Sequence, residues 1–138
     1  MWATRAGIHI DRAASAWLIA TYIDTDATFV YVDDLDEVPA HAIAFDMVGC
    51  ELTHQGEDVT FETILVRYDL VDPVLWRIGE IVHQADLEDD RFDAPEAAGL
   101  DRIVRALGLN HSDEAVRKIT ATIFTSLEQY LRRETLRA

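Results

Sequence analysis

Histidines and carboxylates at positions that the apolar pattern places in the interior are the residues best able to do chemistry. His83 and Asp86 are three residues apart, so their side chains would project from neighbouring positions on one face of a helix. Glu62 lies on the inward flank of another predicted helix, where burying a carboxylate without a partner is costly. His54 lies in the loop that leads into that helix. Imidazole and carboxylate groups gathered inside a protein are typical of metal or proton chemistry.

These side chains predict a metal site whose ligands come from one loop and two adjacent helices: His54, Glu62, His83 and Asp86. Nitrogen and oxygen donors suit a divalent transition metal such as zinc, iron or manganese, rather than calcium or a thiolate-bound metal. Cys50 is the only cysteine in the sequence, which excludes a thiolate-rich zinc site. Asp46 is a candidate further ligand, or a residue that orients one. The alternative is that His83 bonds to the backbone and the two carboxylates pair with arginines.

A second group near the N-terminus, comprising Arg5, Asp11 and Arg12, suggests anion or substrate binding. Asp11 is the expected N-cap of an almost wholly apolar helix, which places Arg12 in the first turn of that helix. A helix N-terminus offers free N–H groups and a partial positive charge, and a guanidinium adds a planar fork that suits oxyanions. The alternative is a structural Arg–Asp pair that holds the N-terminal segment to the core.

The helix that carries His83 is expected to lie at the centre of the fold. It begins at Asp72-Pro73, because aspartate is a good N-cap and proline fits the first helical position. At about 100° per residue, one stripe of this helix collects the apolar residues Val74, Leu75, Ile78, Ile81, Val82 and Ala85. The opposite side, with Trp76 and Gly79, is not a solvent face either. A helix of this kind is expected to be buried on two sides.

The rest of the pattern predicts an α+β fold, mostly helical, with a small β-sheet near the N-terminus. Runs of β-branched and aromatic residues predict short strands at 2–6, 28–32 and 42–45. Capping residues and apolar stripes predict helices at 11–23, 60–68, 73–89, 93–108 and from 112 onward. No repeat, linker or low-complexity segment divides the sequence, so residues 1–138 are expected to form a single domain.

The charge pattern limits the partners that this chain can have. The net charge is −14, and no lysine or arginine occurs between Ala13 and Val66. Such a surface opposes contact with nucleic acid and with anionic membranes, which attract proteins rich in lysine and arginine. The sequence has no apolar run near the roughly 20 residues of a membrane span, and its start lacks the layout of a signal peptide, so a cytoplasmic protein is expected. The long last helix could pair in a homodimer.

Several ordered motifs spread over nearly the whole chain resemble the C-terminal domain of the chromate resistance protein ChrB family. They begin with Trp2-Ala-Thr-Arg5 and with the helix start Ile10-Asp-Arg-Ala-Ala-Ser-Ala-Trp-Leu-Ile19. Later motifs are Phe45-Asp-Met, Thr53-His-Gln-Gly, Thr60-Phe-Glu-Thr, Ile81-Val-His-Gln-Ala-Asp-Leu and Glu96-Ala-Ala-Gly-Leu100. The resemblance favours a joint functional role for the predicted metal ligands and the N-terminal arginine group.

The resemblance implies a role in the response to chromate, where the full-length family protein is regarded as a chromate-sensing regulator. This sequence is expected to carry only the C-terminal domain of that pattern, so DNA binding by this chain alone is not expected. The leading hypothesis is a metal-binding domain for chromate resistance or sensing that holds an oxyanion, such as chromate or sulfate, beside the metal. The rival is a metal-dependent redox or hydrolytic enzyme acting on a small anion, and a third hypothesis is a purely structural module.

Overall fold

The computed structural model describes residues 1–89 and 91–137 of the chain. Its helices are α1 (Ile10–Leu18), α2 (Thr60–Arg67), α3 (Pro73–Leu87), α4 (Glu96–Gly108) and α5 (Asp113–Arg137). Its strands are β1 (Trp2–Arg5), β2 (Phe29–Val32) and β3 (Ile43–Ala44). The predicted α+β class, mostly helical with a small N-terminal sheet, is confirmed.

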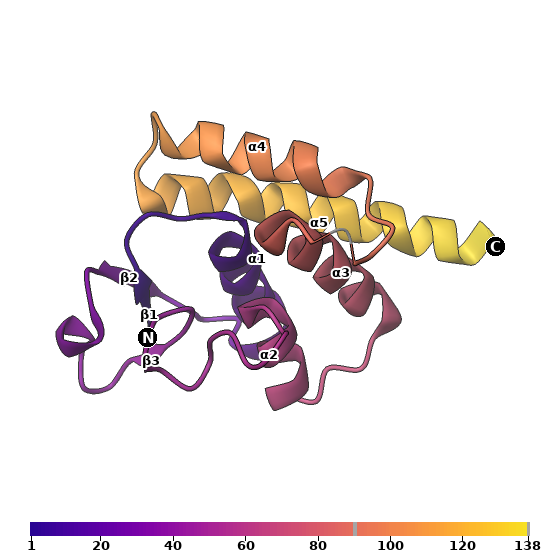
Figure 1. Ribbon diagram of the computed structural model, residues 1–138. Coiled ribbons are helices and arrows are strands. Elements are labelled where there is room, and N and C mark those ends of the chain that lie inside the picture. The colour runs from indigo at the N-terminus through magenta and orange to yellow at the C-terminus, as the bar shows by residue number, and fades with distance from the viewer. Residues whose placement is uncertain (90, 138) are drawn as a thin grey trace.

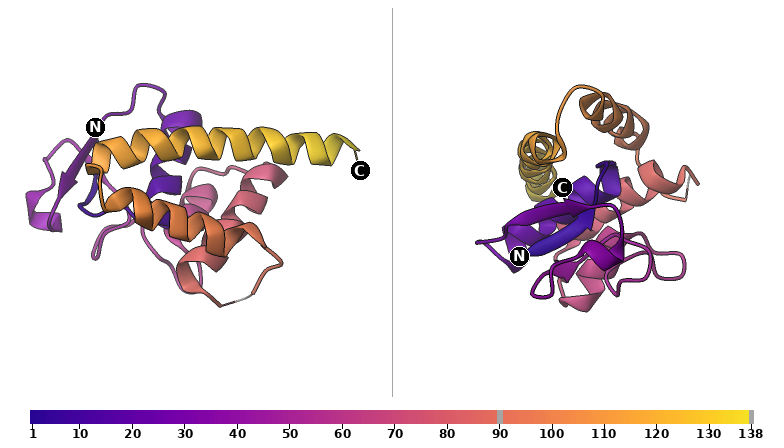
Figure 2. Two further views of the ribbon diagram at one scale, coloured as in Figure 1. Left: turned by 90° about the horizontal axis from the view of Figure 1, so that it is seen from above. Right: turned by 90° about the vertical axis from the view of Figure 1, so that its left-hand side faces the viewer.

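The small sheet lies at one end of the helical body (Figure 1). Strand β1 is in the middle and pairs in parallel with both β2 and β3, giving the order β2-β1-β3. Helices α4 and α5 run side by side across the other helices, and the C-terminal end of α5 extends past the rest of the molecule (Figures 1 and 2). No helix in the described part of the chain combines the length and apolar character that a membrane span needs.

Aromatic packing around Trp17 joins the helices that surround the core. The Trp17 ring is stacked on Phe61 of α2 with centroids 6.5 Å apart, and it lies 5.8 Å from the ring of Phe124 on α5. All three rings are buried. Because α1, α2 and α5 meet at this one side chain, the position of α2 relative to α1 is fixed by the core and not only by polar contacts.

The first predicted helix differs from the structure at both ends. Its N-cap is His9 and not Asp11, which lies within the first turn. After Leu18 the backbone widens into a π-helix at Ile19–Ile23, a distortion that apolar periodicity cannot reveal. Because Asp11 does not cap α1, its carboxylate is available to bond with another helix.

Helix α3 is buried on two sides, as its sequence pattern predicts. Its buried residues include the predicted apolar stripe and also Gly79 and His83 from the opposite side. A Cβ atom at Gly79 would lie 3.4 Å from the Phe61 ring and 3.6 Å from Cγ of Glu62, which are ordinary contact distances. The glycine therefore leaves room for one methyl group where α3 packs on α2, and for little more.

We expect Gly79→Ala to be neutral or to stabilise the protein by up to about 1 kcal/mol, because alanine favours the helix and meets no clash. Gly79→Leu should instead cost about 1–3 kcal/mol by overpacking the α2–α3 contact. Urea denaturation of the two variants checks both values. A destabilised alanine variant would show that the contact is tighter than its distances indicate.

Candidate functional site

The carboxylate of Asp11 joins α1 to the start of α2. Asp11 is buried, with 2% of its surface exposed. Its two oxygens accept hydrogen bonds from the backbone N–H groups of Thr60, at 2.9 Å, and Phe61, at 3.0 Å. These N–H groups belong to the first turn of α2, where they have no partner within the helix and carry partial positive charge. Asp11 is therefore held in a fixed orientation.

His54 and Asp86 complete a cluster around this fixed carboxylate. Nε2 of His54 lies 3.0 Å from Oδ2 of Asp11 and 3.5 Å from Oδ2 of Asp86. One donor atom from each of the three residues lies within 4.8 Å of the other two. The His54 side chain is 44% exposed and that of Asp86 is 23% exposed, so the cluster is open to solvent on one side. The donor set, one imidazole and two carboxylates, fits a transition-metal ion.

Negative charge is crowded around His54. Burial and the nearby Asp11 charge raise the pKa of Asp86 to about 6, against the opposing effect of His54. Burial and Asp11 likewise raise the pKa of Asp46, although Arg12 acts in the other direction. The pKa of His54 is raised, chiefly by its hydrogen bond to Asp11. Carboxylates that repel one another in this way would be stabilised in their ionised forms by a bound cation.

Arg12 is engaged by acceptors within the chain. Its Nη1 donates to the carbonyl of Gly7 at 2.7 Å and its Nη2 to the carbonyl of Asp46 at 3.0 Å. Its Nε forms an ion pair with Oδ2 of Asp46 at 3.0 Å. Asp46 has a positive φ of 50° and also accepts a 2.7 Å hydrogen bond from the Thr60 hydroxyl. Arg12 thus holds the N-terminal loop to the segment after β3. This is the arrangement expected if Arg12 forms a structural Arg–Asp pair instead of an anion site.

Glu62 and His83 form a second, deeper group. Nδ1 of His83 lies 2.6 Å from Oε1 of Glu62, and Nε2 lies 3.0 Å from Oδ2 of Asp89. His83 has no exposed surface and Glu62 is 6% exposed. Burial lowers the pKa of His83, but the hydrogen bonds that the ring donates to the carboxylates of Glu62 and Asp89 outweigh burial and leave that pKa raised. Glu62 also accepts a hydrogen bond from the N–H of Val59. The Glu62–His83 pair and the cluster at Asp11 are therefore both bonded to the start of α2.

The four predicted metal ligands are therefore divided between two groups. His54 and Asp86 come together with Asp11, which the sequence had suggested as a substrate residue, whereas Glu62 pairs with His83. Arg5 is exposed at the end of β1, and Arg12 is bonded to Gly7 and Asp46. Sequence reasoning missed Asp89, because the predicted helix runs to residue 89 whereas α3 ends at Leu87, so the contact of Asp89 with His83 does not follow from helical spacing.

Comparison with known proteins gives one family and one curated relative. The sequence matches the family described as ChrB, C-terminal domain, over residues 2–131. Protein ChrB of Cupriavidus metallidurans is 38% identical over 109 residues, which cover 74% of this chain and 34% of the relative. The matched region is thus about a third of the relative's length. No solved structure matches. With nearly its whole length matched, the chain belongs to the ChrB C-terminal domain family.

Proposed function

We propose that this chain is a metal-binding domain that acts in chromate resistance or sensing, with Asp11, His54 and Asp86 as ligands of a divalent transition metal. The observation that carries the proposal is the convergence of three donor atoms within 4.8 Å of one another. The raised pKa values of Asp86 and Asp46 support it, because a cation would offset both their burial and the repulsion that the Asp11 charge exerts on each. Zinc, iron and manganese are the metals that this donor set favours.

Glu62 and His83 support the cluster indirectly. Both ring nitrogens of His83 already face carboxylates of Glu62 and Asp89, so neither nitrogen is available as a ligand in the cluster. Glu62 holds the N–H of Val59, and Asp11 holds the next two N–H groups along the chain. We therefore assign Glu62 and His83 the role of fixing the α2 start, and through it the orientation of Asp11. Such indirect support of a metal ligand is common in metal sites.

The oxyanion part of the proposal uses the solvent side of the cluster. A metal held by three protein ligands keeps an open coordination position, and half-exposed His54 lies on that side. Chromate or sulfate would bind there. Arg12 is bonded to Asp46, which also bonds to Thr60 at the start of α2, but it would have to exchange one of its bonds to Gly7 or Asp46 for the oxyanion. Arg5, exposed at the end of β1, is the other proposed contact.

One observation favours the rival enzyme. The pKa of Asp86 is about 6, so this carboxyl group can exchange a proton near neutral pH when it is not bound to a metal. In the enzyme a bound metal would supply Lewis acidity to a small anionic substrate, and Asp86 would accept or return a proton instead of serving as a ligand. Metal-dependent turnover that is lost in Asp86→Asn would support an enzyme over a sensor.

The metal content of the purified protein tests the site directly. We expect about one transition-metal ion per chain after incubation with zinc, iron or manganese salts and desalting, measured by elemental analysis. His54→Ala and Asp86→Asn should lose most of this metal, while His41→Ala, at an exposed histidine outside the cluster, should keep it. A wild-type protein that retains no metal would rule out the proposed centre.

Chromate and sulfate binding tests the oxyanion part separately. Isothermal titration calorimetry on the metal-loaded protein should give binding that is lost in Arg12→Ala and absent in the metal-free protein. The Arg12→Ala variant must also be shown to bind metal normally, because Arg12 packs against Asp46. Equal binding with and without metal would contradict an oxyanion site on the metal.

A further inference from the structure

A groove between α3 and α4 forms a second candidate site, separate from the cluster at His54. It has a volume of about 450 Å³, within the range of pockets that bind small organic molecules. Its floor is formed by small side chains, including the buried Ala85 and Ala97. Its rim is charged, with Glu88 at the end of α3 and Arg102 and Arg105 on α4.

Arg105 is held in place and still has free donors. Its Nε donates to Oδ2 of Asp101 at 3.0 Å, one turn earlier on α4. The Asp101 side chain is only 13% exposed and that of Arg105 is 56% exposed, so this contact orients a guanidinium that is otherwise open to solvent. The two Nη groups form no hydrogen bond with any residue that the structure describes. A guanidinium fixed through Nε, with its Nη atoms unengaged, is well prepared to bind a carboxylate.

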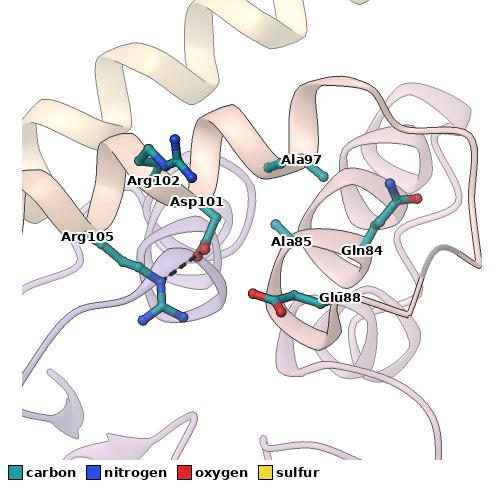
Figure 3. Close-up of a pocket in the computed structure, with 8 residues that line it drawn as sticks. Gln84, Ala85, Glu88, Ala97, Asp101, Arg102 and Arg105 are labelled. Atoms are coloured by element: carbon teal, nitrogen blue, oxygen red, sulfur yellow. Dashed lines mark hydrogen bonds and ion pairs between the residues drawn. The ribbon is translucent and has the colours of Figure 1, made fainter.

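Glu88 supplies the opposite charge on the other wall of the groove. Its side chain points from the end of α3 toward Asp101 and Arg105 (Figure 3). Glu88 forms no ion pair within 4.0 Å among the described residues, although its charge acts on the guanidinium of Arg105. The groove therefore presents a cation and an anion that face each other across a gap instead of closing on one another.

The charges on both walls restrict the ligand. The lining includes two arginines and two carboxylates, so it has no net charge, in a chain whose net charge is −14. A bare dianion would be repelled by Glu88 and Asp101, and a simple cation by the arginines. A tetrahedral oxyanion would also leave most of the volume empty. A small organic molecule that carries one positive and one negative charge can form an ion pair with each wall.

We propose that the groove between α3 and α4 binds a small zwitterion of the amino-acid type, with its carboxylate on Arg105 and its ammonium group on Glu88. Arg102, three residues from Arg105 on α4, lies close enough along the helix to assist with the carboxylate. The floor of alanines leaves room for the side chain of the ligand. This site does not depend on the proposed metal centre, which uses other residues.

Calorimetric titration of the full chain with each of the twenty common L-amino acids tests the proposal. We expect at least one to bind with a dissociation constant of about 1 mM or lower. Arg105→Gln and Glu88→Gln should each weaken that binding by about tenfold or more, because each removes a charge-assisted contact. Arg133→Gln, at an exposed arginine near the end of α5, is the matched control and should leave binding unchanged.

Blocked forms of the same amino acid show which end contacts which wall. The N-acetyl form lacks the ammonium group, so it should bind weakly to the wild type and lose nothing further in Glu88→Gln. The C-terminal amide should behave in the same way toward Arg105→Gln. The proposal is overturned if no amino acid binds, if Arg105→Gln binds as well as the wild type, or if sodium sulfate binds this groove as tightly as the amino acid.

Discussion

Replacing His83 with leucine is expected to lower the free energy of unfolding by about 3–5 kcal/mol. The imidazole lies 2.6 Å from the Glu62 carboxylate, and His83 is wholly buried. Leucine fills a similar space but leaves Glu62, which is 6% exposed, as a buried charge without its partner. Removing one member of a buried pair costs more than the pair itself contributes, because the remaining charge has lost its water as well.

A second substitution separates this electrostatic cost from simple loss of packing. The double variant Glu62→Met/His83→Leu buries no charge and should recover part of the lost stability, as a positive coupling between the two sites. His41→Leu, at an exposed histidine, should change stability by about 0.5 kcal/mol or less. Urea denaturation measures all three variants. If His83→Leu cost less than about 1 kcal/mol, Glu62 would not be an ionised partner of His83.

The sequence predicts the elements of this fold better than it predicts their contacts. Apolar periodicity identifies α3 and its two buried sides, and with them the burial of His83. It identifies Glu62 as a carboxylate in need of a partner, and the structure supplies one. These predictions succeed because the burial of one face of a helix follows from spacing along the chain alone.

Periodicity along the chain does not reveal which side chains of different elements pair with one another. Asp11 has the residue type and position of an ordinary N-cap, yet its carboxylate bonds to the start of α2, 49 residues later in the chain. That contact depends on how α1 and α2 cross, which the packing of Trp17 against Phe61 determines. For the same reason the sequence could collect His54, Glu62, His83 and Asp86 as candidates but could not divide them into two groups.

The metal-free protein is expected to lose stability as the pH rises from about 4 to 8, first through Asp86 and then through the histidines. Asp86 has a folded-state pKa of about 6, above its ordinary value of 3.8. A group whose pKa is raised by folding stabilises the native state when protonated, and this contribution disappears as pH rises through the folded pKa. The loss for Asp86 is up to about 3 kcal/mol, and it falls between about pH 4 and 6, the range from the ordinary to the folded-state pKa. The raised pKa values of His54 and His83 act in the same direction.

Groups that act in the opposite direction do so at lower pH. The pKa of Glu114 is lowered to about 2, chiefly by its hydrogen bonds with Arg117, and that of Asp72 is lowered by Arg132. A lowered carboxylate pKa adds stability that is lost only as pH falls through the folded value. These two groups are therefore fully ionised between pH 5 and 8, so the slope of stability against pH in that range comes from Asp86 and the histidines.

A bound metal should reverse this slope. Protons compete with the metal for Asp86 and His54, so metal affinity rises with pH. Zinc at about a thousand times its dissociation constant should add about 4 kcal/mol at pH 8, and much less at pH 5.5. Thermal denaturation with and without zinc across this range measures the effect. Because the same carboxylates that destabilise the metal-free protein are those that hold the metal, the two curves should diverge as the pH rises.

Asp86→Asn distinguishes this explanation from a general effect of net charge. Asparagine resembles the protonated carboxyl, so the metal-free variant should show a shallower loss of stability between about pH 4 and 6, and little stabilisation by zinc. Asp26→Asn removes the same charge at an exposed position and should keep the wild-type slope. If both variants flattened the slope equally, the net charge of −14 and not the cluster at His54 would be its cause. Crowding of carboxylates around one histidine would then be a property of the acidic surface, and the cluster would lose its main electrostatic support as a metal site.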